Sequence, residues 1–248
     1  MSERVHKLIA QSGIMSRRQA EVMIAEGKVK LNGVTITEMG TKATFEDHIE
    51  VDGTPIEKKE EPVTYVFYKP EGVVTTTHDP EGRPTVIDYI SDSRRVYPVG
   101  RLDYDTSGLL LLTNEGELAN LLTQPKHHVP KVYEVTFTGV LRRRTSNIFE
   151  KGMILEKRKL QPVEVMHVKV DPKTEKTSCQ LILREGKNHQ IKKMLAEFGH
   201  DVIRLKRIQL GPLTLEGLQK GTYRVLKPHE KKQLIAAVKI KKTPHQKS

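Results

Sequence analysis

Apolar residues near the start of the chain recur at helical spacing, and this pattern predicts two short helices. The first helix has four apolar positions: Val5, Leu8, Ile9 and Ile14. The second is predicted over residues 17–26, where Ser16 can cap the N-terminus and Gly27 ends the helix. Its apolar face consists of Ala20, Met23 and Ile24.

Alternating apolar and polar residues after these helices predict short strands. Residues 28–31 and 34–36 form two such runs, and Asn32-Gly33 between them is a strong signal of a hairpin turn. Residues 49–53 add a further strand and turn. The start of the chain is therefore expected to fold as one small unit.

A second unit is predicted to begin after the polar, proline-ended linker of residues 58–62. A strand follows at 63–68, and a helix is expected to start near Asn114. Beyond that helix the pattern is mostly β, with strands at 133–138 and 163–168. The chain thus divides into three expected parts: residues 1–60, residues 61–236, and a basic tail at 237–248 that we expect to be disordered.

The charge of the chain favours a polyanionic partner. Its 248 residues include 42 Lys and Arg against 31 Asp and Glu, which gives a net charge of +11. Residues 1–58 hold eight basic and nine acidic side chains, so 34 and 22 remain for the rest of the chain. The excess positive charge therefore lies after residue 58. A basic surface that serves solubility alone is the alternative.

Several classes of protein do not fit the sequence. No apolar run approaches the length that spans a bilayer, and the first seven residues lack the apolar core of a secretion signal. The single cysteine, Cys179, excludes an intrachain disulfide, and its predicted strand at 178–183 indicates a packed residue. No His, Cys or carboxylate cluster has metal-ligand spacing, and no glycine-rich loop suits a phosphate, so we expect no metal and no cofactor. These observations favour a cytoplasmic protein.

The most informative segment is residues 100–114, with the sequence GRLDYDTSGLLLLTN. It places Asp103 in a short polar loop directly before the apolar run 109–112, where mixed folds often hold catalytic groups. The segment resembles the catalytic motif of pseudouridine synthases that modify ribosomal RNA. The resemblance implies an α+β fold with a mixed, largely antiparallel sheet. It also implies that Asp103 is the catalytic carboxylate, acting as a nucleophile or as a base.

The N-terminal unit resembles a second family. Residues 5–36, VHKLIAQSGIMSRRQAEVMIAEGKVKLNGVTI, are similar to the S-four-type RNA-binding module. Arg17 and Arg18 stand at the predicted N-terminus of the second helix, where amides and cations together suit phosphate groups. We therefore expect residues 1–60 to bind RNA and residues 61–236 to be the catalytic domain. A small solvated cap without a ligand is the alternative for the first unit.

The resemblance also implies a partner for the catalytic carboxylate. Residues 184–194 are similar to the third motif of the family, in which Lys192 takes the place of the basic residue that pairs with the catalytic Asp. Such a cation is needed, because an unpaired carboxylate in a dry pocket would take up a proton. We expect neighbouring Ile191 to contact the substrate, Asn188 to cap the helix and Gly199 to end it.

Three further residues are candidates for substrate contacts. Tyr133 matches the tyrosine that stacks on the target base, a contact worth about 1–3 kcal/mol. Arg101 faces the same way as Asp103 on an extended chain, so it can fill the space that an extruded uridine leaves or bind a flanking phosphate. Lys69 lies in a segment similar to the KPxGxxxT of the family. The alternative for Tyr133 is an ordinary core residue, the alternative for Arg101 is a local partner of Asp105, and the alternative for Lys69 is a loop residue at a strand end. Asp105 itself is expected to be a structural turn residue.

Three classes of function follow. The leading one is the isomerisation of uridine in structured ribosomal RNA, within an assembling subunit, by a monomer without a cofactor. Residues 198–213 look more like the members that modify large-subunit RNA, and small-subunit RNA is the alternative target. The second class is a non-catalytic RNA-binding factor for ribosome assembly, in which Asp103 is idle. The third is a hydrolase that uses Asp103 with Asp105, although residues two positions apart are poorly placed on opposite faces of a sugar.

Overall fold

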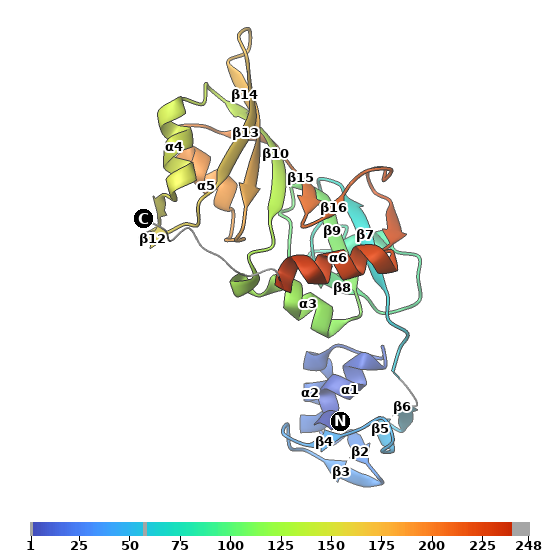
Figure 1. Cartoon of the computed structure of the whole chain (residues 1–248). Coiled ribbons are helices and arrows are strands. Elements are labelled where there is room, and N and C mark those ends of the chain that lie inside the picture. The colour runs from blue at the N-terminus through green and yellow to red at the C-terminus, as the bar shows by residue number, and fades with distance from the viewer. Residues whose placement is uncertain (1, 57–58, 240–248) are drawn as a thin grey trace. The chain divides into compact units, whose positions relative to one another are not determined.

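The structure, a computed structural model, describes residues 2–56 and 59–239 (Figure 1). The chain splits into two compact units: Met1–Val63 with Asp92–Val96, and Thr64–Ser91 with Tyr97–Ser248. The assignment of 92–96 to the first unit was not expected. Its physical basis includes a hydrogen bond from the backbone N of Arg95 to Oε1 of Glu60, at 3.1 Å.

The helices of the first unit largely follow the predicted pattern. They are α1 (Val5–Gln11) and α2 (Arg17–Ala25). Ser16 caps α2 as expected, since its hydroxyl accepts from Gln19 N and the Gln19 side chain accepts in return from Ser16 N. The expectation that Ile14 belongs to the first helix is wrong. Helix α1 ends at Gln11, and Ile14 is 46% exposed beyond the turn at Gly13.

Six short strands complete the first unit. They are β1 (Glu3–Arg4), β2 (Val29–Leu31), β3 (Val34–Ile36), β4 (Lys42–Ala43), β5 (Ile49–Val51) and β6 (Thr54–Ile56). Four of them form an antiparallel sheet in the order β3-β2-β5-β6, and β1 pairs with β4. The predicted turn joins β2 to β3, with φ of 49° at Asn32 and 82° at Gly33. Side chains of both helices and of β2 and β5 close the core of this unit.

The second unit is built on one nine-stranded sheet. Its strands are β7 (Thr64–Lys69), β8 (Tyr97–Val99), β9 (Ser107–Thr113), β10 (Lys131–Thr138), β13 (Glu164–Asp171), β14 (Lys176–Leu183), β15 (Val202–Leu210), β16 (Leu213–Thr214) and β17 (Tyr223–Val225). The main path runs β13-β14-β10-β15-β9-β7-β17, with β16 beside β15 and β8 beside β9. Every pair in this sheet is antiparallel except β9 with β15. The expected α+β fold with a mixed, largely antiparallel sheet is confirmed.

The remaining elements of the second unit are short helices and one separate hairpin. The α-helices are α3 (Gly116–Thr123), α4 (Arg143–Lys151), α5 (Gln190–Ala196) and α6 (Pro228–Lys239). Two single 3₁₀ turns are η1 (Val86–Tyr89) and η2 (Pro125–His127), and β11 (Ile154–Leu155) pairs with β12 (Arg158–Lys159). Helix α6 reaches three residues into the expected tail because Val238, 3% exposed, packs in the core. Residues 240–248 of that tail lie outside the described residues.

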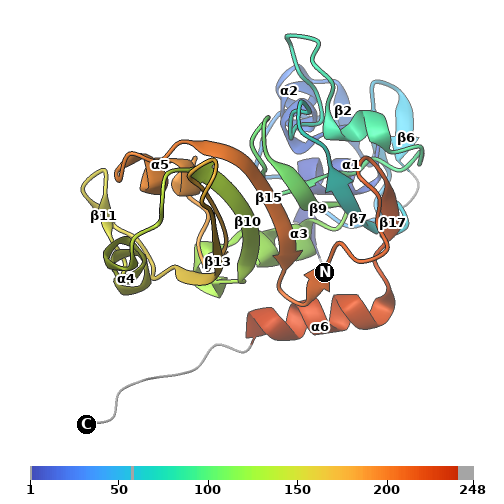
Figure 2. The ribbon, with the colours of Figure 1, turned by 90° about the horizontal axis from the view of Figure 1, so that it is seen from above.

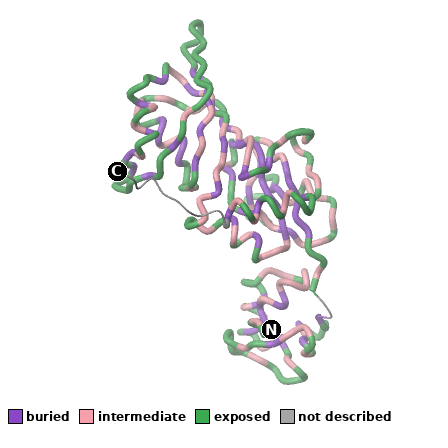
Figure 3. Tube along the Cα trace, in the orientation of Figure 1, coloured by how far each residue is buried: buried purple, intermediate pink, exposed green. Residues whose placement is uncertain are grey.

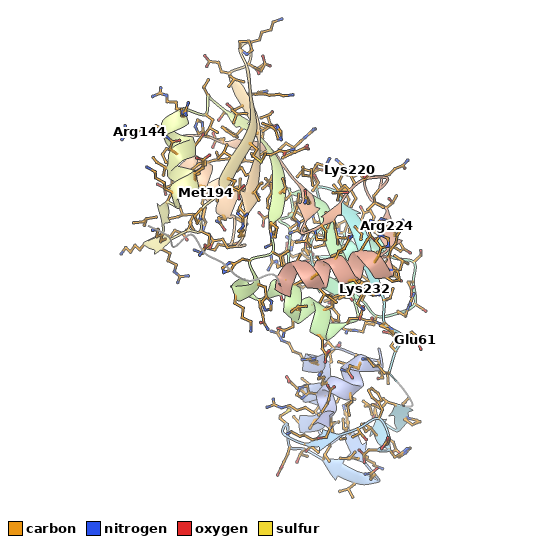
Figure 4. All side chains as sticks on the ribbon, viewed as in Figure 1. Glu61, Arg144, Met194, Lys220, Arg224 and Lys232 are labelled. Carbon is orange, nitrogen blue, oxygen red and sulfur yellow. The ribbon has the colours of Figure 1, made fainter. Side chains whose placement is uncertain are left out.

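Helices cover the two halves of the sheet and form two apolar cores. Helices α4 and α5 pack on β10 and β14, while α3 and α6 pack on β7 and β9. Figure 2 shows α6 beside the β7–β9 half and α4 beside the β10–β13 half. Met194 of α5, labelled in Figure 4, is 1% exposed in the first of these cores. Figure 3 shows buried positions following the inner strands, whereas β13 at the sheet edge is mostly exposed.

Gly108 lets β9 and β15 approach each other closely. Its φ is +120°, and a Cβ atom at this position would lie 2.2 Å from the carbonyl oxygen of Arg207. The two residues are partners in the parallel pairing of β9 with β15. A residue without a side chain is therefore required where the loop of Asp103 enters the sheet.

The cysteine is packed, as predicted. Cys179 lies in β14 and is 5% exposed, and burial raises the pKa of its thiol to about 12. No helix in the described part of the chain is long and apolar enough to cross a membrane.

Candidate active site

The loop that carries Asp103 is held by a buried lysine. Lys69 at the end of β7 is 0% exposed, and its Nζ donates to the carbonyl oxygens of Pro70 (3.0 Å), Asp103 (3.0 Å) and Thr106 (2.9 Å). Burial lowers the pKa of the Lys69 amine to about 8, although nearby carboxylates act in the opposite direction. The amine of Lys69 is directed at the backbone of the protein itself, so the expected contact of Lys69 with substrate stays a prediction.

The residues after Lys69 hold the same loop at two more points. The backbone N of Gly72 donates to the carbonyl oxygen of Tyr104 at 2.8 Å. The hydroxyl of Thr75 donates to the carbonyl oxygen of Leu102 at 2.7 Å and accepts from Leu102 N at 3.3 Å. The segment 69–75 is thus a cradle for the Asp103 loop, which the sequence pattern did not reveal.

Asp103 lines a cavity of about 560 Å³. This volume lies within the range of sites for small molecules. Five of the residues predicted for the site meet in its wall: Arg101, Asp103, Tyr133, Ile191 and Lys192. They come from the Asp loop, from β10 and from α5, which are far apart in sequence. The fold therefore brings together the three residues predicted to be catalytic and two of the five residues predicted to bind substrate.

Two basic side chains face the carboxylate of Asp103. Lys192 Nζ lies 3.5 Å from one carboxylate oxygen, and His189 Nε2 lies 3.5 Å from the other. The Asp103 side chain is 28% exposed, so it is partly withdrawn from water. The predicted pairing of Lys192 with Asp103 is thus present in the geometry. The contact of His189 was missed, although His189 stands in the same motif.

Lys192 makes its shortest contact with a different carboxylate. Its Nζ donates to Oδ1 of Asp105 at 2.5 Å, although Asp105 is 67% exposed. Burial raises the pKa of the Asp105 carboxyl, but the hydrogen bond and charge of Lys192 outweigh it and hold the pKa below its ordinary value. Asp105 was expected to be a structural turn residue. It also shares the cation of Asp103, a contact that the sequence did not reveal.

The start of α5 differs from the predicted cap. Asn188 does not cap the helix, because the residue at the N-cap is His189, with φ of 51°. Gln190 organises the preceding turn instead: its side chain accepts from Lys187 N (3.1 Å) and donates to Glu185 Oε1 (2.8 Å). The sequence did not predict the left-handed backbone conformation of His189. The same residue places its side chain 3.5 Å from Asp103. Helix α5 ends before Gly199 as expected.

The cavity wall combines aromatic, charged, apolar and polar side chains. Tyr133 in β10 is half-buried, Arg101 is exposed and Ile191 is 4% exposed. Thr106, which no sequence pattern marked as a site residue, is 2% exposed, and its hydroxyl has no hydrogen-bond partner among the described residues. An unpartnered buried hydroxyl in a cavity wall is a group that a polar ligand can satisfy.

Two predicted RNA contacts belong to the first unit. Arg17 and Arg18 open α2, and both are exposed. In the parts of the chain that the structure describes, no cluster of three or more His, Cys, Asp or Glu side chains could hold a metal ion.

Comparison with protein families finds matches in both units. Residues 63–197 match the RNA pseudouridylate synthase family, and residues 3–49 match the S4 domain. The first match includes Asp103, Tyr133 and Lys192.

Individual relatives match almost the whole chain. The ribosomal large subunit pseudouridine synthase B of Bacillus subtilis (strain 168) is 46% identical over 235 residues, which is 94% of this chain and 96% of that protein. An uncharacterised RNA pseudouridine synthase of Aquifex aeolicus (strain VF5) is 40% identical over 98% of both chains. A crystal structure of a pseudouridylate synthase has a TM-score of 0.66 and 30% identity, and the match covers 93% of this chain and 99% of that one.

Proposed function

The chain belongs to the RNA pseudouridylate synthase family, and we propose that it converts a specific uridine of large-subunit ribosomal RNA to pseudouridine with Asp103 as the catalytic carboxylate. The observation that carries this proposal is the position of Asp103. It lies in the wall of the 560 Å³ cavity, facing Lys192 and His189 and beside Tyr133.

The reaction needs little beyond these groups. The bond between the ribose and the uracil nitrogen breaks, the base turns, and it rejoins the same ribose carbon through a ring carbon. Reactant and product have the same atoms and electrons apart from proton relocation, so no oxidant or reductant is consumed. Asp103 acts close to the sugar, either as a nucleophile or as a base, and the cation of Lys192 keeps it ionised while water is excluded.

The other wall residues position the nucleotide. Tyr133 stacks on the extruded base, and Arg101 occupies the space that the base leaves or binds a flanking phosphate. Ile191 contributes an apolar contact, and the free hydroxyl of Thr106 hydrogen-bonds the substrate. Lys69 acts indirectly, through the backbone of the Asp103 loop.

The whole chain supports ribosomal RNA as the substrate. The net charge of +11 suits a polyanion, and the relative from B. subtilis that matches 94% of the chain is named for the large ribosomal subunit. We place the RNA-binding role of the first unit on Arg17 and Arg18 at the start of α2. The enzyme acts as a monomer, in the cytoplasm, on an assembling subunit.

Position-resolved mapping of pseudouridine tests this proposal. Ribosomal RNA is compared from cells that lack the protein and from cells that regain it as wild type or as Asp103→Asn. We expect a large-subunit position to lose its pseudouridine and to regain it only with the wild type. The purified Asp103→Asn variant should be slower by at least about a thousandfold, because only the charge of the carboxylate changes.

The same experiment separates the alternatives. A lost position in small-subunit RNA would replace the large-subunit target. Full activity of Asp103→Asn would remove Asp103 as the catalytic group. A chain that supports ribosome assembly without changing any pseudouridine would be a binding factor.

A further inference from the structure

A second cavity lies beside the one that holds Asp103. Its volume is about 170 Å³, whereas one water molecule takes a share of about 30 Å³ in the liquid. The two cavities have five lining residues in common: Gly100, Arg101, Tyr133, Glu185 and Gly186. A group in the second cavity would therefore be a direct neighbour of the group in the first.

One buried and one half-buried cation line the second cavity without forming an ion pair with a carboxylate in the described part of the chain. Arg207 of β15 is 3% exposed, and its Nε donates to the carbonyl oxygen of Leu109 at 2.7 Å. Lys131 of β10 donates to the carbonyl oxygen of Val129 at 3.0 Å. Burial, and then the charge of Arg207, lower the pKa of Lys131 to about 8, with only Glu185 acting in the opposite direction. Within residues 2–56 and 59–239, neither cation forms an ion pair.

The carboxylate that lines this cavity is already engaged elsewhere. Glu185 Oε1 accepts from the backbone N of Gln161 (3.0 Å) and from Nε2 of Gln190 (2.8 Å). Its other oxygen lies 3.3 Å from Nζ of Lys187. Glu185 thus interacts with other groups, and the positive charges of Lys131 and Arg207 are not neutralised by an ion pair among the described residues.

Three residues that line the cavity carry a buried polar atom without a hydrogen-bond partner among the described residues. The atoms are Nη2 of Arg207, Nδ1 of His128 and Oε1 of Gln124. Buried polar groups are nearly always paired, and Nη2 of Arg207 is a charged donor that an oxyanion can satisfy, whereas Gln124 Oε1 is an acceptor that an oxyanion cannot satisfy. Because the unneutralised charge at this cavity is positive, the occupant that fits Arg207 is an oxyanion.

We infer that the second cavity is a phosphate subsite, which receives the backbone phosphate of a nucleotide directly next to the target uridine. The inference rests on the proposed function for the placement of the uridine in the first cavity. Arg207 and Lys131 hold the phosphate oxygens, while the base stacks on Tyr133 in the wall that the cavities share. A phosphate fixed there sets the distance between the ribose and Asp103, so the subsite positions the sugar as well as binding RNA.

The first arm of the test uses inorganic phosphate with the full-length protein. Crystals of the wild type soaked in phosphate should show the anion within hydrogen-bond distance of Arg207 and Lys131. Lys131→Met removes the charge and keeps the length of the side chain, and it should abolish this binding. Lys169→Met is the matched control, because Lys169 is exposed on β13 and lies outside the cavity. The control should bind phosphate as the wild type does.

The second arm identifies the source of the phosphate. The probe is a synthetic stem-loop with the uridine that the mapping identifies, made with a neutral methylphosphonate at one flanking linkage at a time. Binding is measured with Asp103→Asn, so that no turnover is needed. One flanking replacement should weaken binding about tenfold, and adding Lys131→Met should then cost little more, since both changes remove the same contact. Lys169→Met should add its own effect independently.

The phosphate soak and the RNA-binding measurements together decide between the outcomes. Absence of phosphate from the cavity together with additive RNA effects would overturn the inference. Phosphate in the cavity without coupling to any flanking linkage would mean an adventitious ion only, and would also overturn it. Coupling in the Asp103→Asn background, together with a wild-type protein that forms no pseudouridine in the same stem-loop, would leave the phosphate subsite in place and remove the proposed function instead.

Discussion

At the scale of single residues, one cation serves two carboxylates. Lys192 Nζ lies 2.5 Å from Asp105 and 3.5 Å from Asp103, while His189 stands 3.5 Å from Asp103 on the other side. Asp103 is thus held by two longer contacts rather than by one tight pair. This looser arrangement is consistent with the proposed catalytic role of Asp103, because a tight bidentate pair would fix its oxygens.

The role of Lys192 can be tested against its neighbour. Lys192→Met should lower the catalytic rate nearly as much as Asp103→Asn, because it leaves the carboxylate without its nearest permanent cation. Lys192→Arg should keep most of the activity. Lys193→Met is the control: Lys193 pairs with Glu156 at 2.6 Å and does not line the cavity, so its loss should change the rate little. The measurement is single-turnover pseudouridine formation, and a fully active Lys192→Met would contradict the pairing.

At the scale of elements, the loop that carries Asp103 depends on the fully buried Lys69. Lys69→Met would leave several buried carbonyl oxygens of the Asp103 loop without a donor. We expect the free energy of unfolding to fall by about 1–3 kcal/mol and the activity to fall with it. Denaturant unfolding and single-turnover assays measure the two effects. Loss of activity without loss of stability would instead mean that Lys69 contacts the substrate.

Lys69 also makes the stability depend on pH. Its pKa in the folded protein is about 8, below the ordinary value of 10.5. Between these values the unfolded chain binds more protons than the folded one, so this group makes the free energy of unfolding rise with pH. The rise should be smaller in Lys69→Met than in the wild type, and it should not vanish, because Lys131 has a similarly lowered pKa. Urea unfolding of the wild type and of Lys69→Met at pH 8 and pH 10 tests this. An equal rise in the free energy of unfolding for both proteins would contradict the prediction.

The close contact between β9 and β15 leads to a third prediction at this scale. Gly108→Ala would place a methyl group 2.2 Å from the Arg207 carbonyl oxygen at a φ of +120°. We expect a loss of at least about 3 kcal/mol of stability, since strain and overlap act together. Gly186→Ala is the control, because a Cβ there meets nothing within 4 Å. Thermal unfolding of both variants gives the comparison, and equal midpoints would refute the close approach.

At the scale of the whole molecule, we propose that charge and recognition are divided between the two parts of the chain. Residues after 58 carry 34 basic and 22 acidic side chains, whereas the first 58 carry eight and nine. Non-specific attraction to phosphate should therefore come mainly from the second unit, and it should weaken as salt is added. The exposed arginines at the start of α2 are proposed to select the place on the RNA where the enzyme acts.

The full-length double variant Arg17→Ala/Arg18→Ala tests this division. It keeps the first unit intact, which matters because residues 92–96 pack within that unit. Binding to an unrelated RNA at low salt should change little, while the pseudouridine yield at the natural site should drop at least about tenfold. Filter binding against salt and site-resolved yield are measured together. An unchanged yield at the natural site would show that recognition does not depend on these arginines.

The sequence by itself predicted many of the elements of this protein and the family to which it belongs. Periodicity located both N-terminal helices, the hairpin at Asn32-Gly33 and the main strands, because these depend on local spacing and turn residues. Long motifs pointed to Asp103, Tyr133 and Lys192 together, and the fold places all three around one cavity. Motifs record residue types, so they identify which groups take part.

Only the tertiary structure decided which of these residues contact one another. The packing placed the amine of Lys69 against the backbone of the Asp103 loop, and it put His189 rather than Asn188 at the N-cap of α5. The sharing of Lys192 between two carboxylates and the unneutralised charge of Arg207 depend on strands and helices distant in sequence. Distances, burial and unpaired donors belong to packed neighbours, and no local pattern of residues encodes them.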